Sequence, residues 1–260
     1  MFKEQGDEIE ATPLLMRREI YAGKPWLIET AGVDVQKDRI EFSVVGWGVG
    51  EEAWLIEHVI LPGDTAQPYV WEELSETLKQ WNIKICCVDH GYNATMVAEF
   101  VKKHGYSVAV KGTPGMARPL VEDEKKRRQR LRVKRKKGIP VEPLGVDQGK
   151  GIIYSRLKQT EAGAGYIHFP QTSSFDDEYF AQLTAEKLVP RVKGMRTFYE
   201  WVNMRLRNET LDCLNYALAG LKMLNIDWAK LKPTSTTALP QATTKPIKPT
   251  IAKSEWASRL

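Results

Sequence analysis

The chain has 260 residues, of which 42% are hydrophobic, and carries a formal net charge of +5. No stretch reaches the roughly 18 consecutive apolar residues of a membrane span, and the first residues lack the apolar core of a signal peptide. The three cysteines, Cys86, Cys87 and Cys213, give neither a disulfide framework nor a zinc spacing. These features argue against a membrane protein and a disulfide-stapled protein, and they predict a globular domain in a reducing cytoplasm.

The positive charge is concentrated in two segments. Residues 122–137 contain ten Lys or Arg against three acidic residues, and residues 230–260 contain six against one. The rest of the chain is therefore mildly acidic. Such a distribution indicates a polyanionic partner that is contacted through these two segments.

The first 25 residues show no clear periodicity, and we predict a linker or N-terminal extension over 1–25. Alternating β-branched and aromatic residues with tight turns then predict three antiparallel strands. A helix, a wholly apolar strand, a second helix and a fifth strand follow. These elements are expected at 26–35, 39–47 and 52–61, then at 68–81, 83–88, 93–104 and 106–110.

Residues 112–138 are predicted to form a polar loop that carries the basic run. The last predicted element is a helix with a leucine stripe and Asn208 as its N-cap. The expected elements are a strand at 139–146, a helix at 148–159, a short strand at 166–169, a helix at 175–188, hairpin strands at 188–193 and 196–202, and the final helix at 209–225.

This order predicts an α/β fold of the ribonuclease-H-like class, in which three antiparallel strands and then parallel strands form a mixed sheet flanked by helices. The domain is expected to span 26–228. The Pro-, Thr- and Lys-rich segment 229–260 has the composition of a flexible basic tail.

Three aspartates are candidates for catalysis. Asp34 follows an apolar run and lies between Val33 and Val35, where a core strand normally has an apolar residue. Asp89 ends the fourth strand, which is expected to lie beside the first. Asp212 falls in the first turn of the last helix, where the helix dipole favours a carboxylate.

Three converging carboxylates require counter-charge, which two hard divalent cations held by oxygen ligands would supply. We therefore predict that Asp34, Asp89 and Asp212 bind two Mg²⁺ or Mn²⁺ ions. A single Asp after a strand is usually a turn residue, and Asp38 is the better example of that. His90, Asp147 and Lys150 are candidates for supporting contacts, with Asp147 more typical of a helix cap.

The basic run is denser than an ordinary solvated helix or loop face, which favours contact with DNA phosphates over a nuclear-localisation tract. No phosphate-binding Gly-x-x-x-x-Gly-Lys-[Ser/Thr] motif occurs, so no P-loop ATPase is predicted. The candidate DNA-binding residues are Lys111, Lys125, Lys126, Arg127, Arg128, Arg130, Arg132, Lys134, Arg135, Lys136 and Lys137.

Several motifs between 26 and 225 resemble the nuclease domain of the large terminase subunit of tailed bacteriophages, of the lambda type. The matching stretches are AGVDVQKDR at 31–39, VGWG at 45–48, EEAWLI at 51–56, PGD at 62–64, VD at 88–89, VKG at 110–112, GVD at 145–147, YSRL at 154–157, GYIHFP at 165–170, QLTAE at 182–186 and RNETLDC at 207–213.

The resemblance implies a ribonuclease-H-like endonuclease whose three metal-binding aspartates fall on Asp34, Asp89 and Asp212. It implies that concatemeric double-stranded viral DNA is cut during packaging, in the host bacterial cytoplasm. The implied partners are an ATPase motor domain, absent here, the small terminase subunit, and the portal protein, which residues 254–260 would contact as a docking peptide. The chain is then expected to be a fragment of the full subunit.

Two alternatives stay open on sequence alone. One is another ribonuclease-H-like phosphodiesterase, of the junction resolvase or transposase type. The other is a non-catalytic DNA-binding or portal-docking module whose acidic residues are structural.

Overall fold

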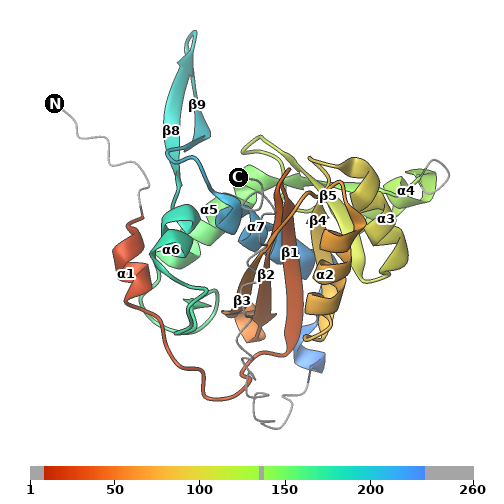
Figure 1. Cartoon of the computed structure of the whole chain (residues 1–260). Coiled ribbons are helices and arrows are strands. Elements are labelled where there is room, and N and C mark those ends of the chain that lie inside the picture. Colours follow the sequence, from red (N-terminus) through yellow and green to blue (C-terminus); the bar gives the residue numbers. More distant parts are fainter. Residues whose placement is uncertain (1–8, 135–137, 232–260) are drawn as a thin grey trace, which may run out of the picture.

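The computed structural model describes residues 9–134 and 138–231. Seven strands form one mixed sheet in the order β6-β5-β4-β1-β2-β3-β7, and β8 and β9 form a separate two-stranded sheet (Figure 1). The strands are β1 (Ile28–Val35), β2 (Arg39–Trp47), β3 (Ala53–Pro62), β4 (Ile83–Asp89), β5 (Ser107–Thr113), β6 (Val141–Gly145), β7 (Ile167–His168), β8 (Glu186–Lys193) and β9 (Arg196–Asn203). The α-helices are α1 (Ala11–Leu15), α2 (Pro68–Leu78), α3 (Ala94–Lys103), α4 (Glu124–Lys134), α5 (Val146–Leu157), α6 (Asp177–Leu183) and α7 (Glu209–Leu224).

Strand β1 lies in the middle of the large sheet. It pairs antiparallel with β2 and parallel with β4, and β4 pairs parallel with β5. The predicted ribonuclease-H-like order, with three antiparallel strands followed by parallel ones, is confirmed. The carboxyl ends of β1, β4 and β5 consequently meet at one edge of the sheet.

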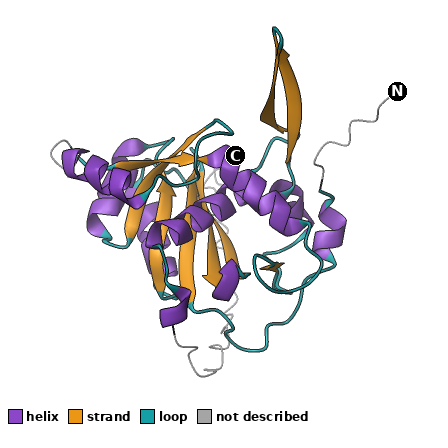
Figure 2. Cartoon of the chain, turned by 180° about the vertical axis from the view of Figure 1, so that it is seen from behind, coloured by secondary structure: helices purple, strands orange, loops and turns teal. Residues whose placement is uncertain are grey.

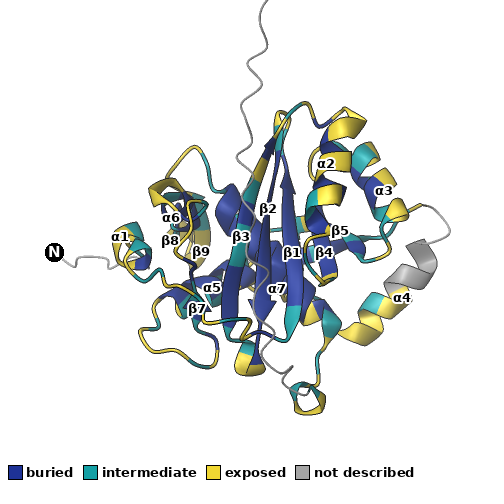
Figure 3. Cartoon of the chain, turned by 60° about the horizontal axis from the view of Figure 1, so that its bottom comes forward, coloured by how far each residue is buried: buried dark blue, intermediate teal, exposed yellow. Residues whose placement is uncertain are grey.

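The two faces of β1 belong to different parts of the core. Ala31, Val33 and Val35 pack in the apolar cluster that contains the inward residues of α2 and α3. The alternate residues face α7, because the Thr30 hydroxyl donates to the Ala217 carbonyl at 2.8 Å. The strand is buried on both faces (Figure 3), as is typical of a central strand in a sheet that is covered by helices.

Helix α7 crosses the back of the sheet (Figure 2) and touches β1 at Gly32. A Cβ on Gly32 would lie 1.9 Å from the Cys213 carbonyl oxygen and 2.5 Å from the Ala217 nitrogen. Only glycine allows the two backbones to approach so closely. This contact sets how far the first turn of α7 lies from the end of β1.

The prediction of a loop for the basic run was wrong over residues 124–134, which form α4. Lys, Arg, Gln and Leu are all good helix formers, so the local propensity outweighs the repulsion between like charges. Acidic residues support the first turn: Asp123 Oδ1 accepts from the Lys126 N–H at 3.0 Å, and Arg128 pairs with Glu124.

Two further details of the helices were wrong. Helix α6 begins after Asp176, whose side chain accepts from the Tyr179 N–H, but it ends at Leu183 because the chain turns into β8 at Glu186. Asn208 precedes α7 without capping it through its side chain. Its amide nitrogen instead donates to Glu186 and Asp212.

The N-terminal stretch packs against the rest of the domain over its described part. Leu14 in α1 is buried, and the Arg17 guanidinium donates to the carbonyls of Leu157 and Ile167 at 2.9 and 3.2 Å. None of the helices in the described ranges is long and apolar enough to cross a membrane. The C-terminal residues 232–260, including the predicted docking peptide, lie outside the described part.

The β8–β9 hairpin rises away from the large sheet (Figure 1), and its turn contains Gly194 at φ +63°. An isolated two-stranded hairpin is marginally stable in water. Its base is held by Trp201, whose ring lies 4.7 Å from that of Tyr154 and whose indole N–H donates to the Asp147 carbonyl at 3.2 Å.

Gly32→Ala should destabilise the domain, because the added methyl group must push α7 away from β1. We expect a loss of about 3 kcal/mol in the free energy of unfolding, measured by urea denaturation. Gly151→Ala in α5 is the matched control, since a Cβ there meets no atom within 4 Å. Equal stability of the two variants would contradict the close contact.

Candidate active site

Asp34 and Asp89 end neighbouring strands at the same edge of the sheet. Strands β1 and β4 run parallel with Val33 opposite Val88, so the next residue of each strand is an aspartate. Both are buried, with 4% and 9% of their surface exposed. The alternation of β1 points Asp34 toward α7, on the same face as Gly32.

Helix α7 brings Asp212 and Tyr216 to this edge, one turn apart. The Tyr216 side chain acts on Asp89 and lowers the pKa of that carboxyl, against the effect of burial. Burial raises the pKa of Tyr216 far above its ordinary value, and the charges of all three aspartates act in the same direction. Asp34, Asp89 and Asp212 therefore all lie close enough to Tyr216 for their charges to act on it.

The three carboxyls repel one another in a poorly solvated environment. Burial raises the pKa of Asp34 to about 8, and the charges of Asp212 and Asp89 add to this, against a hydrogen bond from Gln36. Burial also raises the pKa of Asp212 to about 6, with Lys150 opposing it. The pKa of Asp89 is raised by burial as well. Among the described residues, the ion pairs bring only Lys150 to these three carboxyls, which is too little positive charge to balance them.

Each aspartate has a local hydrogen-bond partner. Asp34 accepts from the Gln36 amide at 2.6 Å, Asp89 from the Gly91 N–H at 2.8 Å, and Asp212 from the Asn208 amide at 3.3 Å. Within residues 9–134 and 138–231, no group of three or more His, Cys, Asp or Glu side chains is placed to hold a metal ion. The donor set nevertheless fits hard divalent cations, because its oxygens are carboxylates that lack counter-charge.

Lys150 is the cation nearest to these aspartates among the ion pairs of the described residues. Its ammonium lies 3.8 Å from Asp212 Oδ1 and 2.5 Å from Glu186 Oε1. Lys150 was a candidate from the sequence, but Glu186 was not. Glu186 is the first residue of β8, and only the folded chain brings it next to α5 and α7.

A second charged cluster holds the start of α7 against β2. The fully buried Glu41 pairs with Arg39 and Arg207, and both arginines also pair with Glu209 in the first turn of α7. Burial alone would raise the pKa of Glu41, but His58 and the two arginines lower it overall. Sequence reasoning missed this cluster, because its members are up to 170 residues apart in the chain.

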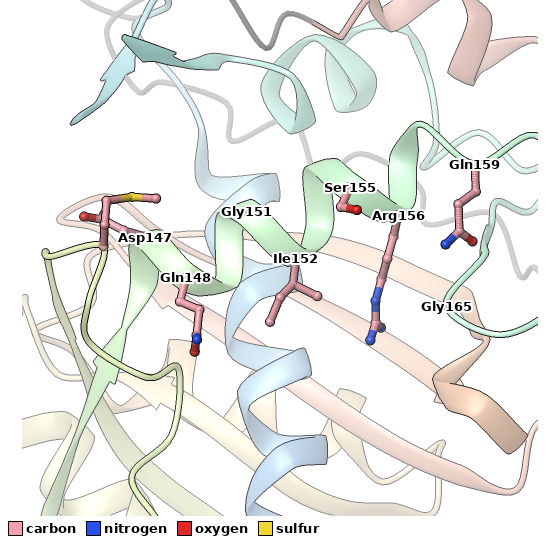
Figure 4. A pocket seen from close by; sticks show the side chains of 9 residues that line it. Asp147, Gln148, Gly151, Ile152, Ser155, Arg156, Gln159 and Gly165 are labelled. Atoms are coloured by element: carbon pink, nitrogen blue, oxygen red, sulfur yellow. The ribbon is translucent and has the colours of Figure 1, made fainter. Parts of the chain in front are cut away.

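The remaining candidates for supporting contacts are His90 and Asp147. His90 follows β4, and its N–H donates to the Val110 carbonyl at 2.8 Å. Asp147 lies in the first turn of α5, where its carboxylate accepts from the Gly115 N–H at 2.6 Å and so fixes a loop. Asp147 also lines a cavity of about 480 Å³ along α5, together with Gln148 and Arg156 (Figure 4).

The basic candidates differ in their surroundings. Lys111 on β5 and Lys125, Lys126 and Arg128 on α4 are exposed. Arg127 is half-buried and donates to Glu142 and to the Met223 carbonyl, both at 3.2 Å. Its side chain therefore stabilises the fold. Arg130, Arg132 and Lys134 belong to α4, while Arg135, Lys136 and Lys137 lie outside the described residues.

Comparison with known proteins identifies the family. The family described as "Terminase large subunit gpA, endonuclease domain" matches residues 1–232. The chain belongs to this family.

The similarity to a curated relative agrees with this. The chain is 34% identical over 243 residues to the terminase large subunit of Escherichia phage lambda, covering 86% of this chain and 37% of that protein. It thus spans just over a third of the length of this relative. It is also similar to the crystal structure of the large terminase nuclease from thermophilic phage G20c, with 13% identity, a TM-score of 0.37, and coverage of 80% of this chain and 97% of that one.

The stability of this endonuclease domain should depend on pH through Asp34. Its pKa of about 8 in the folded, metal-free protein exceeds the ordinary value of 3.8, so folding favours the protonated form. The stabilisation is fully present below the ordinary pKa and is lost as the pH rises through about 8. Asp34→Asn removes this dependence.

We therefore expect the variant to gain stability relative to the wild type as the pH rises from about 5 to 9 in EDTA, measured by thermal unfolding. Asp38→Asn is the matched control, because the Asp38 side chain is 74% exposed. Curves for Asp34→Asn and the wild type that stay parallel across this range would contradict the assigned shift.

Proposed function

We propose that this domain hydrolyses phosphodiester bonds of double-stranded viral DNA with the help of divalent cations, as the nuclease part of a terminase large subunit. The observation that supports this most strongly is the group of three aspartates near Tyr216 at the edge of the sheet, of which Asp34 and Asp89 are buried and Asp212 is partly exposed. A purely structural cluster would be expected to contain compensating arginines, as the cluster around Glu41 does.

In this proposal Asp34, Asp89 and Asp212 hold two Mg²⁺ or Mn²⁺ ions. When bound, such ions lower the pKa of an attacking water and stabilise the leaving oxygen. The protein fixes the carboxylates on rigid elements, since Asp34 and Asp89 end core strands and Asp212 starts a buried helix. Tyr216, which lowers the pKa of Asp89, would help to hold that carboxylate in place.

The wider role is the cutting of concatemeric DNA during packaging, in the host bacterial cytoplasm. There the domain would act beside an ATPase motor and with the small terminase subunit, and residues 254–260 would dock on the portal protein. The exposed cations of α4 and Lys111 on β5 would hold the DNA backbone without reading sequence, because phosphate contacts carry no base information.

Asp34→Asn should abolish cleavage, because the amide removes one negative oxygen ligand without changing the side-chain size. We expect at least about a 1,000-fold loss in plasmid linearisation with Mn²⁺ or Mg²⁺. The wild type should also be inactive in EDTA, and Asp38→Asn should retain activity. Metal-dependent nicking by Asp34→Asn would contradict the assignment, and a strong preference for branched over plain duplex DNA would favour a resolvase.

Neutralising Lys125, Lys126 and Arg128 with glutamine should weaken duplex binding and flatten its salt dependence. The slope of log K against log salt should shrink by about 2 to 3, since each phosphate contact contributes about 0.9. The measurement is fluorescence anisotropy with duplex DNA at several salt concentrations.

The matched control replaces three exposed lysines, Lys79, Lys84 and Lys102, which lie near the opposite edge of the sheet, where α2 and α3 end and β4 begins. It removes the same charge and should leave the slope unchanged. Equal slopes for the α4 variant and the wild type would show that α4 does not contact the DNA.

A further inference from the structure

Two hydrogen-bond donors lie between Glu186 and Asp212, and both are closer to Glu186. The Lys150 ammonium is 2.5 Å from Glu186 Oε1 and 3.8 Å from Asp212 Oδ1. The Asn208 amide is 2.7 Å from Glu186 Oε1 and 3.3 Å from Asp212 Oδ2. The shorter contact of each donor is therefore the one to Glu186.

The position of Glu186 is fixed by its surroundings. It is buried, with 4% of its surface exposed, and Lys150 is 8% exposed. The Tyr154 hydroxyl donates to the Glu186 carbonyl at 2.6 Å, and the Glu186 N–H donates back to that hydroxyl at 3.2 Å. Because Tyr154 lies one turn after Lys150 on α5, the acid and the lysine are held against each other.

This arrangement affects what Asp212 can bind. An ammonium group hydrogen-bonded directly to Asp212 would occupy a carboxylate oxygen and cancel its charge, and both effects oppose a divalent cation. At 3.8 Å the lysine is beyond hydrogen-bond distance of Asp212 and does not occupy its oxygen, although its charge still lowers the pKa of that carboxyl. The Asp212 side chain also keeps 22% of its surface exposed.

We propose that Glu186 is a positioning residue that draws Lys150 and Asn208 away from Asp212 and so keeps this carboxylate open to a divalent cation. The inference rests on the proposed function, because it assumes that Asp212 is a metal ligand. It assigns a role to the acid that begins the β8–β9 hairpin, and it makes Lys150 a competitor of the metal.

The test is the affinity for Mn²⁺, measured by calorimetry on the full chain without DNA. In Glu186→Gln, the lysine loses its partner and shifts to Asp212, so Mn²⁺ should bind about tenfold more weakly. Lys150→Met removes the competitor and should bind Mn²⁺ more tightly than the wild type. Glu200→Gln, an exposed acid on the same hairpin, is the charge-matched control and should leave the affinity unchanged.

The double variant separates this role from a simple effect of charge. If Glu186 acts through Lys150, then Glu186→Gln should change the Mn²⁺ affinity less than about twofold in the Lys150→Met background. An undiminished tenfold loss in that background would overturn the proposal and make Glu186 a direct ligand or a long-range charge. An unchanged affinity in the single Glu186→Gln variant would overturn it as well.

A second variant covers the case in which Glu186→Gln does not fold. Glu186→Asp keeps the charge but shortens the side chain, so Lys150 should move toward Asp212 and Mn²⁺ should bind more weakly, whereas a pure charge effect predicts no change. If the wild type binds no Mn²⁺ at all, the proposed metal dependence of the function fails. If it binds but the variants do not differ, only the role of Glu186 fails.

Discussion

The close contact between α7 and β1 at Gly32 is the constraint on which the candidate site depends. The first strand supplies Asp34 and the last helix supplies Asp212, and these residues are 178 positions apart in the chain. With a Cβ in place of the glycine hydrogen, the helix backbone could not approach the strand, since the atom would lie 1.9 Å from a carbonyl oxygen. A residue with no chemistry of its own thus decides whether the acidic residues can meet.

The same edge of the sheet contains two acidic clusters with different compensation. Around Glu41, two arginines pair with the buried carboxylate and with Glu209 in the first turn of α7, as is typical of a structural ion network. Around Asp34, the positive charge is insufficient and the pKa values of the carboxyls rise. This contrast supports a cation-binding role for the aspartates around Asp34 and a structural role for the cluster around Glu41.

Sequence reasoning predicted the sheet order and the meeting of Asp34 with Asp89, because strand alternation and apolar runs are local signals that specify which edge a residue reaches. It did not find Glu186 or Tyr216, whose roles come from contacts between distant elements and leave no local pattern. It predicted a loop where α4 forms, because a dense run of like charges is typical of a loop. The residues of this run are nevertheless good helix formers. Arg127 belonged to that run by sequence, yet its partner Glu142 makes it a structural residue.

The central claim is that three aspartates from β1, β4 and α7 form one site for divalent cations. The most direct test is anomalous diffraction from crystals of the domain soaked in Mn²⁺. The account predicts two anomalous peaks within about 2.0–2.6 Å of carboxylate oxygens of Asp34, Asp89 and Asp212. Well-diffracting soaked crystals with no peak at these residues, or with peaks only at other acidic groups, would contradict it.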